Sequence, residues 1–240
     1  MPFFAVFTDF QPISVTPTVR QESVIQYLSQ LFMEAGQGDF HAPYTTPEIK
    51  KRVEKYGVSP EYIRNRELNI LPPNFEESSV YPDFLPNPKN QPEGDNLSRR
   101  MEIFDEVCCK ATERAFEGES EAPADLVHVS CSGYLAPSPA ERWVSQQGWS
   151  TAVTHSYHMG CYGAFPALRI ATGILASAYA YQQRPDKRVD ILHTEYLSLH
   201  LNITDLSPNN LINATLFGDG FIKYSAWTEE YLPEGKSGLR

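Results

Sequence analysis

The chain has few cysteines, and they form neither a disulfide framework nor a metal site. The four cysteines, at positions 108, 109, 131 and 161, include no C-x-x-C pair, and the six histidines show no metal-ligand spacing. We therefore expect free thiols in a reducing, cytoplasmic compartment and no bound metal.

Long apolar runs and a basic N-terminus are also lacking. The most apolar stretch, Ile170 to Ala180, is interrupted by small polar residues and is shorter than the roughly 20 residues that a bilayer requires. No basic residue precedes the short apolar run at the N-terminus, which argues against a secretion signal. We expect neither a membrane span nor export.

Positive charge is scarce, since the formal net charge is −10. Such a surface repels polyanions, so we expect no general nucleic-acid binding. One local cluster departs from this balance: Lys50, Lys51, Arg52, Lys55, Arg64 and Arg66. The cluster fits either a solvated helix face or a site for an anionic ligand.

What is present is an alternation of short apolar strands and amphipathic helices. We expect a strand at Phe3 to Thr8, a helix at Gln21 to Met33, and a helix capped by Ser98 that runs to about Phe116. Further strands are expected at residues 125–131, 152–157 and 189–194. This order predicts an α/β protein with a mixed, mainly parallel sheet, arranged as one domain or two tightly joined ones.

Residues 71–97 differ from the rest of the chain. Six prolines fall between positions 72 and 92, and the segment shows almost no periodicity. We expect an ordered surface loop there rather than a core element.

Cys161 lies at the head of an apolar helix. Pro166 lacks an N–H and is tolerated only in the first turn, so the helix must begin close to Cys161 or Tyr162. Unpaired N–H groups at a helix N-terminus stabilise a thiolate. Gly160 and Gly163 allow a sharp turn beside the cysteine. The residues following Pro166 are apolar on nearly every side, which predicts a helix inside the protein.

Four segments, in this order, resemble motifs of one enzyme family. They are Val127 to Gly133, Gly160 to Ala164, Leu192 to Glu195 and Leu216 to Gly220, the last reading Leu-Phe-Gly-Asp-Gly. Together they are similar to the type III polyketide synthases of the thiolase superfamily, with the ketoacyl synthase III branch as the neighbouring alternative. The resemblance covers residues 100–220 well and earlier residues weakly.

The resemblance implies a thiolase-like fold, of which residues 1–240 would form the N-terminal αβα half. It implies that Cys161 accepts an acyl group from a thioester and that a decarboxylated malonyl unit then attacks this acyl group. Coenzyme A or acyl-carrier phosphopantetheine thioesters would be substrates, and no permanently bound cofactor is implied.

The same resemblance suggests contact residues for these substrates. Ala136 and Leu201 align with residues that shape the acyl cavity in plant members, so both are expected to line the substrate pocket. Cations that bind the phosphates of coenzyme A, or an acidic carrier protein, align loosely with Lys50, Lys51, Lys55 and Arg64.

Family members continue well past the Gly-Asp-Gly turn, and that second half supplies a histidine and an asparagine. We therefore expect this chain to need a C-terminal half, whether it is a fragment, a homodimer or part of a complex. Two alternatives stay open: a non-catalytic half that serves in assembly or regulation, and a cysteine hydrolase that uses Cys161 with His155. His155 and His158 should lie on opposite faces of their strand.

Overall fold

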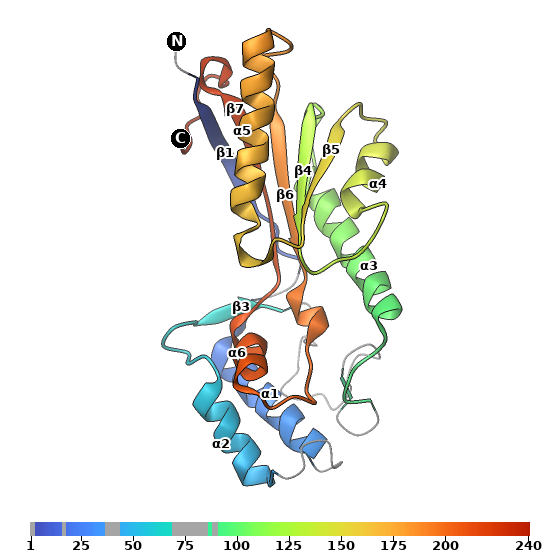
Figure 1. Ribbon diagram of the computed structural model, residues 1–240, viewed down its shortest axis with the longest axis vertical. Coiled ribbons are helices and arrows are strands. Elements are labelled where there is room, and N and C mark those ends of the chain that lie inside the picture. Colours follow the sequence, from blue (N-terminus) through green and yellow to red (C-terminus); the bar gives the residue numbers. More distant parts are fainter. Residues whose placement is uncertain (1–2, 16–17, 37–43, 69–85, 88–90) are drawn as a thin grey trace. The chain divides into compact units, whose positions relative to one another are not determined.

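The computed structural model describes residues 3–15, 18–36, 44–68, 86–87 and 91–240 (Figure 1). They form two compact units that interleave along the chain. The first unit is built from residues 1–15, 105–195 and 220–240, and the second from residues 16–104 and 196–219. The boundary at residue 105 falls inside helix α3 (Leu97–Ala115).

A five-stranded sheet forms the centre of the first unit. Its spatial order is β1-β7-β6-β4-β5. The strands are β1 (Ala5–Pro12), β4 (Asp125–Ser130), β5 (Ala152–Tyr157), β6 (Val189–Glu195) and β7 (Gly220–Thr228). The sheet is mixed, as predicted. Parallel pairing does not dominate it, however, because β4 pairs in parallel with β5 and β6, whereas β7 pairs antiparallel with β6 and β1.

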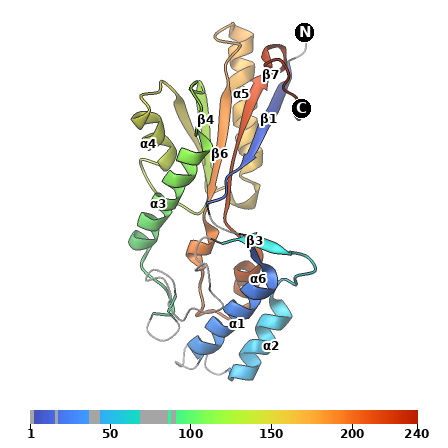
Figure 2. The same ribbon diagram turned by 180° about the vertical axis from the view of Figure 1, so that it is seen from behind.

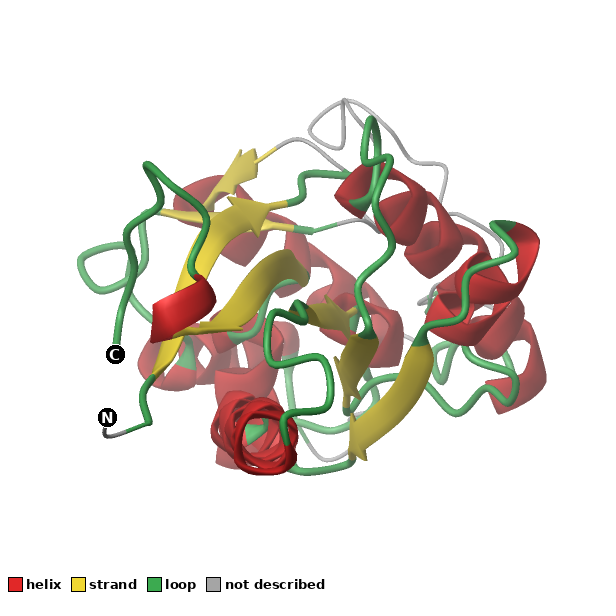
Figure 3. Cartoon of the chain, turned by 90° about the horizontal axis from the view of Figure 1, so that it is seen from above, coloured by secondary structure: helices red, strands yellow, loops and turns green. Residues whose placement is uncertain are grey.

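Helices lie on both faces of this sheet, so the αβα layering predicted for residues 1–240 is found in the first unit. Helix α5 (Ala164–Tyr181) covers one face, and α3 and α4 (Pro139–Gln146) lie on the other (Figures 1 and 2). Figure 3, seen along α5, shows the same separation. Val127 and Val129 of β4 join a buried core with Ala167, Ala171 and Leu175 of α5. Because both faces are covered, β4 is buried almost throughout.

Helix α5 is less enclosed than its composition predicts. One stripe, formed by Ala167, Ala171, Leu175 and Ala178, is buried. On the helix's other sides Phe165 is 64% exposed and Tyr181 is 74% exposed. The prediction of burial all round was wrong for the described chain, because the sheet covers only one side of the helix.

Other predicted elements are largely confirmed. The first strand and first helix appear as β1 and α1 (Gln21–Gly36). Helix α3 begins at Leu97, and its capping residue is Asn96 rather than Ser98, since Asn96 Oδ1 accepts the N–H of Arg99 at 3.0 Å. Most of the proline-rich segment 71–97 lies outside the described residues.

The second unit is built around three mutually packed helices. They are α1, α2 (Thr46–Tyr56) and α6 (Pro208–Leu216), accompanied by an antiparallel pair of short strands, β2 (Thr18–Arg20) and β3 (Asn65–Glu67). Arg66 is buried and donates to the carbonyls of Ala214 and Phe217 at 3.0 and 2.7 Å. A cation thereby satisfies the carbonyls at the C-terminal end of α6.

None of the helices in the described ranges is both long enough and apolar enough to cross a membrane.

Candidate active site

Three neighbouring strands of the first unit end at one edge of its sheet. β4, β5 and β6 run in parallel and finish at Ser130, Tyr157 and Glu195. The segment after β4 begins with Cys131, and the segment after β5 carries Cys161. Open α/β sheets bind ligands beyond the carboxyl ends of their strands, so this edge is the candidate position for an active site.

Cys161 lies in a sharp turn at the head of α5. Residues Gly160–Tyr162 form a short 3-10 helix, and α5 follows from Ala164. Pro166 is therefore the third residue of α5, within its first turn, as predicted. The thiol is exposed. The sequence thus located both the helix start and the accessible cysteine correctly.

The turn owes its shape to two left-handed residues. His158 has φ +56° and Gly160 has φ +66°. A Cβ at Gly160 would meet no atom within 4 Å, so glycine is needed there for its backbone conformation rather than for space. Gly163 is different, because a Cβ there would lie 3.1 Å from Val129 Cγ1. That glycine lets the start of α5 lie against β4.

Glu195 binds the segment that follows β4. The N–H of Cys131 donates to both carboxylate oxygens, at 3.0 and 3.1 Å, and the Ser132 hydroxyl donates to Oε2 at 2.9 Å. The Cys131 thiol also lies 3.5 Å from Oε2. Burial raises the pKa of Glu195, and these donors act in the opposite direction.

Cys131 occupies the space between Glu195 and the Cys161 turn. Burial and the nearby Glu195 carboxylate raise the pKa of Cys131 to about 11, with a smaller contribution from Cys161. The backbone N–H of Gly160 acts in the opposite direction and lowers this pKa. Cys131 is therefore a protonated thiol at neutral pH. Sequence reasoning missed it and Glu195, although both stand at the carboxyl ends of adjacent predicted strands.

The histidines near the turn have partners of their own. His155 Nε2 lies 3.3 Å from Glu141 Oε2, and its ring packs on Tyr157 with centroids 4.5 Å apart. His158 instead stacks on Tyr134, with centroids 4.9 Å apart. The prediction that the two histidines share a strand was wrong, because β5 ends at Tyr157 and His158 has a left-handed φ of +56°.

Comparisons with known proteins find relatives of the kind that the motifs indicate. No protein-family model matches the sequence. Type III polyketide synthase C of Arabidopsis thaliana is 33% identical over 117 residues, which is 48% of this chain and 28% of that protein.

Solved structures match almost the whole chain, among them an algal protein and a domain of a Dictyostelium protein. PKS-I of the brown alga Ectocarpus siliculosus superposes with a TM-score of 0.74 at 18% identity and covers 95% of this chain. The C-terminal type III polyketide synthase domain of Steely1, a type I/III hybrid from Dictyostelium, superposes with a TM-score of 0.69 at 17% identity and covers 93%. The chain has the thiolase-like fold of the type III polyketide synthases. The resemblance predicted from the motifs is confirmed.

The chain spans only part of the proteins that it matches. It covers 57% of the algal structure and 56% of the Steely1 domain. The second half expected from the family therefore stays a prediction, as does every property that depends on it.

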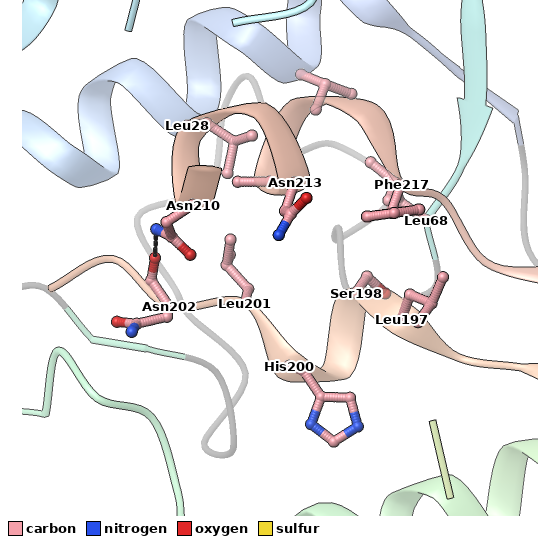
Figure 4. Close-up of a pocket in the computed structure, with 12 residues that line it drawn as sticks. Leu28, Leu68, Leu197, Ser198, His200, Leu201, Asn202, Asn210, Asn213 and Phe217 are labelled. Atoms are coloured by element: carbon pink, nitrogen blue, oxygen red, sulfur yellow. Dashed lines mark hydrogen bonds between the residues drawn. The ribbon is translucent and has the colours of Figure 1, made fainter. Parts of the chain in front are cut away.

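The second unit contains an apolar pocket of about 270 Å³ (Figure 4). Leu201, which the polyketide-synthase resemblance assigned to the substrate pocket, lines it. The other lining residues are Val24, Leu28, Leu68, Leu197, Ser198, His200, Asn202, Asn210, Asn213, Ala214 and Phe217. Ala136 belongs to the first unit and is exposed.

Phe217 shows what the Leu-Phe-Gly-Asp-Gly motif does in this fold. Its ring lines the pocket, while Asp219 accepts the N–H and the hydroxyl of Ser198 at 2.9 and 2.6 Å. A Cβ at Gly218 would lie 3.0 Å from the carbonyl oxygen of Glu67. The motif thus fixes one wall of the pocket. Sequence reasoning recognised the motif but did not assign Phe217 to the pocket.

The four predicted phosphate-binding cations all lie on the surface of the second unit. Lys50, Lys51, Lys55 and Arg64 are exposed. Lys50 makes a long, exposed ion pair with Glu54 at 3.9 Å, which contributes little to stability. Arg52 and Arg66, from the same basic cluster, donate instead to backbone carbonyls. The structure thus separates exposed cations from structural ones.

Metal ligands are not gathered anywhere in the described ranges. No group of three or more His, Cys, Asp or Glu side chains is placed there to hold an ion.

Proposed function

We propose that this chain carries the nucleophile of an acyltransferase that forms carbon–carbon bonds by decarboxylative Claisen condensation. The observation that supports it is the exposed Cys161 thiol in the turn that opens α5, at the edge where β4, β5 and β6 end. The fold shared with type III polyketide synthases gives this arrangement a chemical context.

In the first proposed step, the Cys161 thiolate attacks the carbonyl carbon of an acyl thioester. The carbon–sulfur bond to the donor breaks, and coenzyme A or the carrier phosphopantetheine leaves as its thiol after taking up a proton. The product is an acyl group on Cys161. The turn leaves Cys161 exposed, where a thioester can reach its sulfur.

In the second step, a malonyl thioester loses carbon dioxide and leaves a carbanion. The carbanion attacks the acyl carbonyl, the new carbon–carbon bond forms, and Cys161 departs as a thiolate. Splitting the reaction in this way replaces one difficult step by two easier ones. The carbonyl-polarising histidine and asparagine would come from the second half that the family resemblance implies.

The pocket around Leu201 is the proposed site for the acyl chain. Its lining is mainly apolar, with Leu28, Leu68, Leu201 and Phe217 directed around one cavity (Figure 4). Such a lining favours an aliphatic or aromatic chain over a charged group.

We assign the exposed cations of α2, together with Arg64, to the phosphates of coenzyme A or to an acidic carrier protein. Their side chains are solvent-accessible and bear positive charge on a protein of net charge −10. Binding to them should weaken as salt is added.

The open side of α5 is the proposed contact with a second half, whether this lies in the same polypeptide or in another chain. Phe165 and Tyr181 are largely exposed there. Aromatic side chains are enriched where proteins contact partners, which makes this helix a candidate contact. If Cys161 proves unreactive, the alternative function is assembly or regulation through this helix.

Covalent capture tests the proposal. The purified protein is incubated with an acyl-coenzyme A and its intact mass is measured, followed by peptide mapping. We expect one acyl group on Cys161 and none in Cys161→Ala. Cys109→Ser is the matched control, because the Cys109 thiol is partly buried and donates a hydrogen bond to Asp105. An unmodified wild-type protein, or acylation that survives Cys161→Ala, would contradict the proposal.

A further inference from the structure

Glu195 is a partly buried carboxylate whose position the proposed chemistry does not explain. It is the last residue of β6, and it points at the segment that follows the neighbouring strand β4. Burying a carboxylate is unfavourable unless hydrogen-bond donors surround it. Here the N–H and thiol of Cys131 and the hydroxyl of Ser132 provide them.

Cys131 connects this carboxylate to the turn of the exposed cysteine. Its backbone and thiol face Glu195, and the N–H of Gly160 lies close enough to its sulfur to lower its pKa. Gly160 is the residue immediately before Cys161. A single side chain therefore separates the Glu195 carboxylate from the backbone of the nucleophile turn.

Two more hydrogen bonds hold the same turn. The N–H of His158 donates to the carbonyl of Ser130 at 3.0 Å, and the N–H of Gly163 donates to the carbonyl of Gly160 at 3.0 Å. Ser130 immediately precedes Cys131. The turn is thus attached to the end of β4 through His158, and Glu195 accepts hydrogen bonds from the two residues that follow this end.

We propose that Glu195 is a positioning residue: acting through Cys131, it holds the turn that carries Cys161. The catalytic consequence rests on the proposed function, whereas the positioning itself does not. Glu195 accepts hydrogen bonds from Cys131 and Ser132, so its effect on Cys161 is transmitted through the Cys131 thiol and backbone.

Amide hydrogen exchange measured by NMR tests the positioning directly. We expect exchange at the Gly160 N–H to speed up at least tenfold in Cys131→Ala and in Glu195→Ala, because each removes one link. Cys131→Ser keeps a hydroxyl that can both donate and accept, so it should restore most of the protection. Should Glu195→Ala not fold, Glu195→Gln replaces it, with at least a threefold acceleration expected.

Glu141→Gln is the matched control. Glu141 accepts the N–H of Ser138 at 2.7 Å and lies in the same unit, but it caps α4. This variant should speed exchange in α4 and leave Gly160 unchanged. Unaltered Gly160 exchange in both Cys131→Ala and the Glu195 variant would overturn the inference.

The reactivity of Cys161 separates positioning from a simple charge effect. Acylation is followed against pH in wild type and Glu195→Gln. Positioning predicts a several-fold lower rate on the high-pH plateau, with little change in KM. If Glu195 acted only through its charge, the midpoint would move to lower pH with the plateau intact, and the inference would fail. A wild-type protein that is never acylated would reject the proposed function and leave the exchange result standing.

Discussion

The backbone N–H of Cys131 donates to both carboxylate oxygens of Glu195, at 3.0 and 3.1 Å. This bond joins the ends of two parallel strands, β4 and β6, at the edge where the exposed Cys161 also lies. The candidate site therefore lies in the segments that directly follow hydrogen-bonded strand ends. Each of the following predictions tests one part of this arrangement.

Gly160→Ala should disturb the nucleophile turn. A left-handed φ of +66° costs a residue with a Cβ about 1–2 kcal/mol, so we expect unfolding free energy to fall by about that amount. We also expect slower alkylation of Cys161 by iodoacetamide. Gly148→Ala is the control, since Gly148 has φ +64° and equally open surroundings but lies after α4. Equal loss of stability in both variants, with slower alkylation in Gly160→Ala alone, is the expected result.

Ala214→Leu should reduce the pocket of the second unit. Ala214 lines the cavity with Leu201 and Phe217, and a larger side chain would occupy space offered to an acyl chain. We expect at least tenfold weaker binding of a fluorescent fatty acyl probe, with short chains less affected than long ones. Asn209→Leu adds a similar side chain at an exposed position of α6 and should bind the probe normally. Unchanged binding in Ala214→Leu would exclude this cavity as the acyl site.

His128→Gln should change the pH dependence of stability. Burial lowers the pKa of His128 to about 3, with His155 as a smaller cause. Between about 6.5 and 3 the unfolded chain therefore binds the proton and the folded chain does not, so stability is lost as pH falls through this window. One such group contributes a slope of up to about 1.4 kcal/mol per pH unit.

Asp190 gives stability a pH dependence of the opposite sign over part of the same pH range. Burial raises its pKa to about 6, so the folded chain binds that proton more tightly and the stability it contributes is lost as pH rises from about 4 to 6. The test therefore compares the His128→Gln variant with the wild-type protein. Urea unfolding from pH 7 to 4 should show a smaller loss of stability in His128→Gln than in wild type. Parallel curves would show that His128 does not titrate as its burial implies.

Phe165→Glu should reduce association through α5. The side chain is 64% exposed, so we expect unfolding free energy to change by less than about 0.5 kcal/mol. Self-association or capture of a second half should weaken, measured by analytical ultracentrifugation. Ser145→Glu adds the same charge at an exposed position of α4 and should associate like wild type. Identical sedimentation of both variants and wild type would argue against this surface as an interface.

Local patterns predicted the parts of the site that depend on neighbouring residues. Pro166 restricted the start of α5 to a few residues, and Gly160 with Gly163 indicated a tight turn at Cys161. Both predictions are confirmed, because helix starts and left-handed turns are decided within a few residues. The capping residue of α3 was misplaced by two positions, since Asn96 and Ser98 are both suitable caps.

The sequence by itself determined the alternation of strands and helices, the elbow at Cys161 and the resemblance to type III polyketide synthases, since all three reside in short-range patterns. Only the tertiary structure decided that Glu195 accepts a hydrogen bond from Cys131, 64 residues away, and that Phe217 lines the same pocket as Leu201. It also decided that only one stripe of α5 is buried, so that Phe165 and Tyr181 stay exposed. Such relationships depend on strand order and on what each face packs against, and residue spacing along the chain does not specify these.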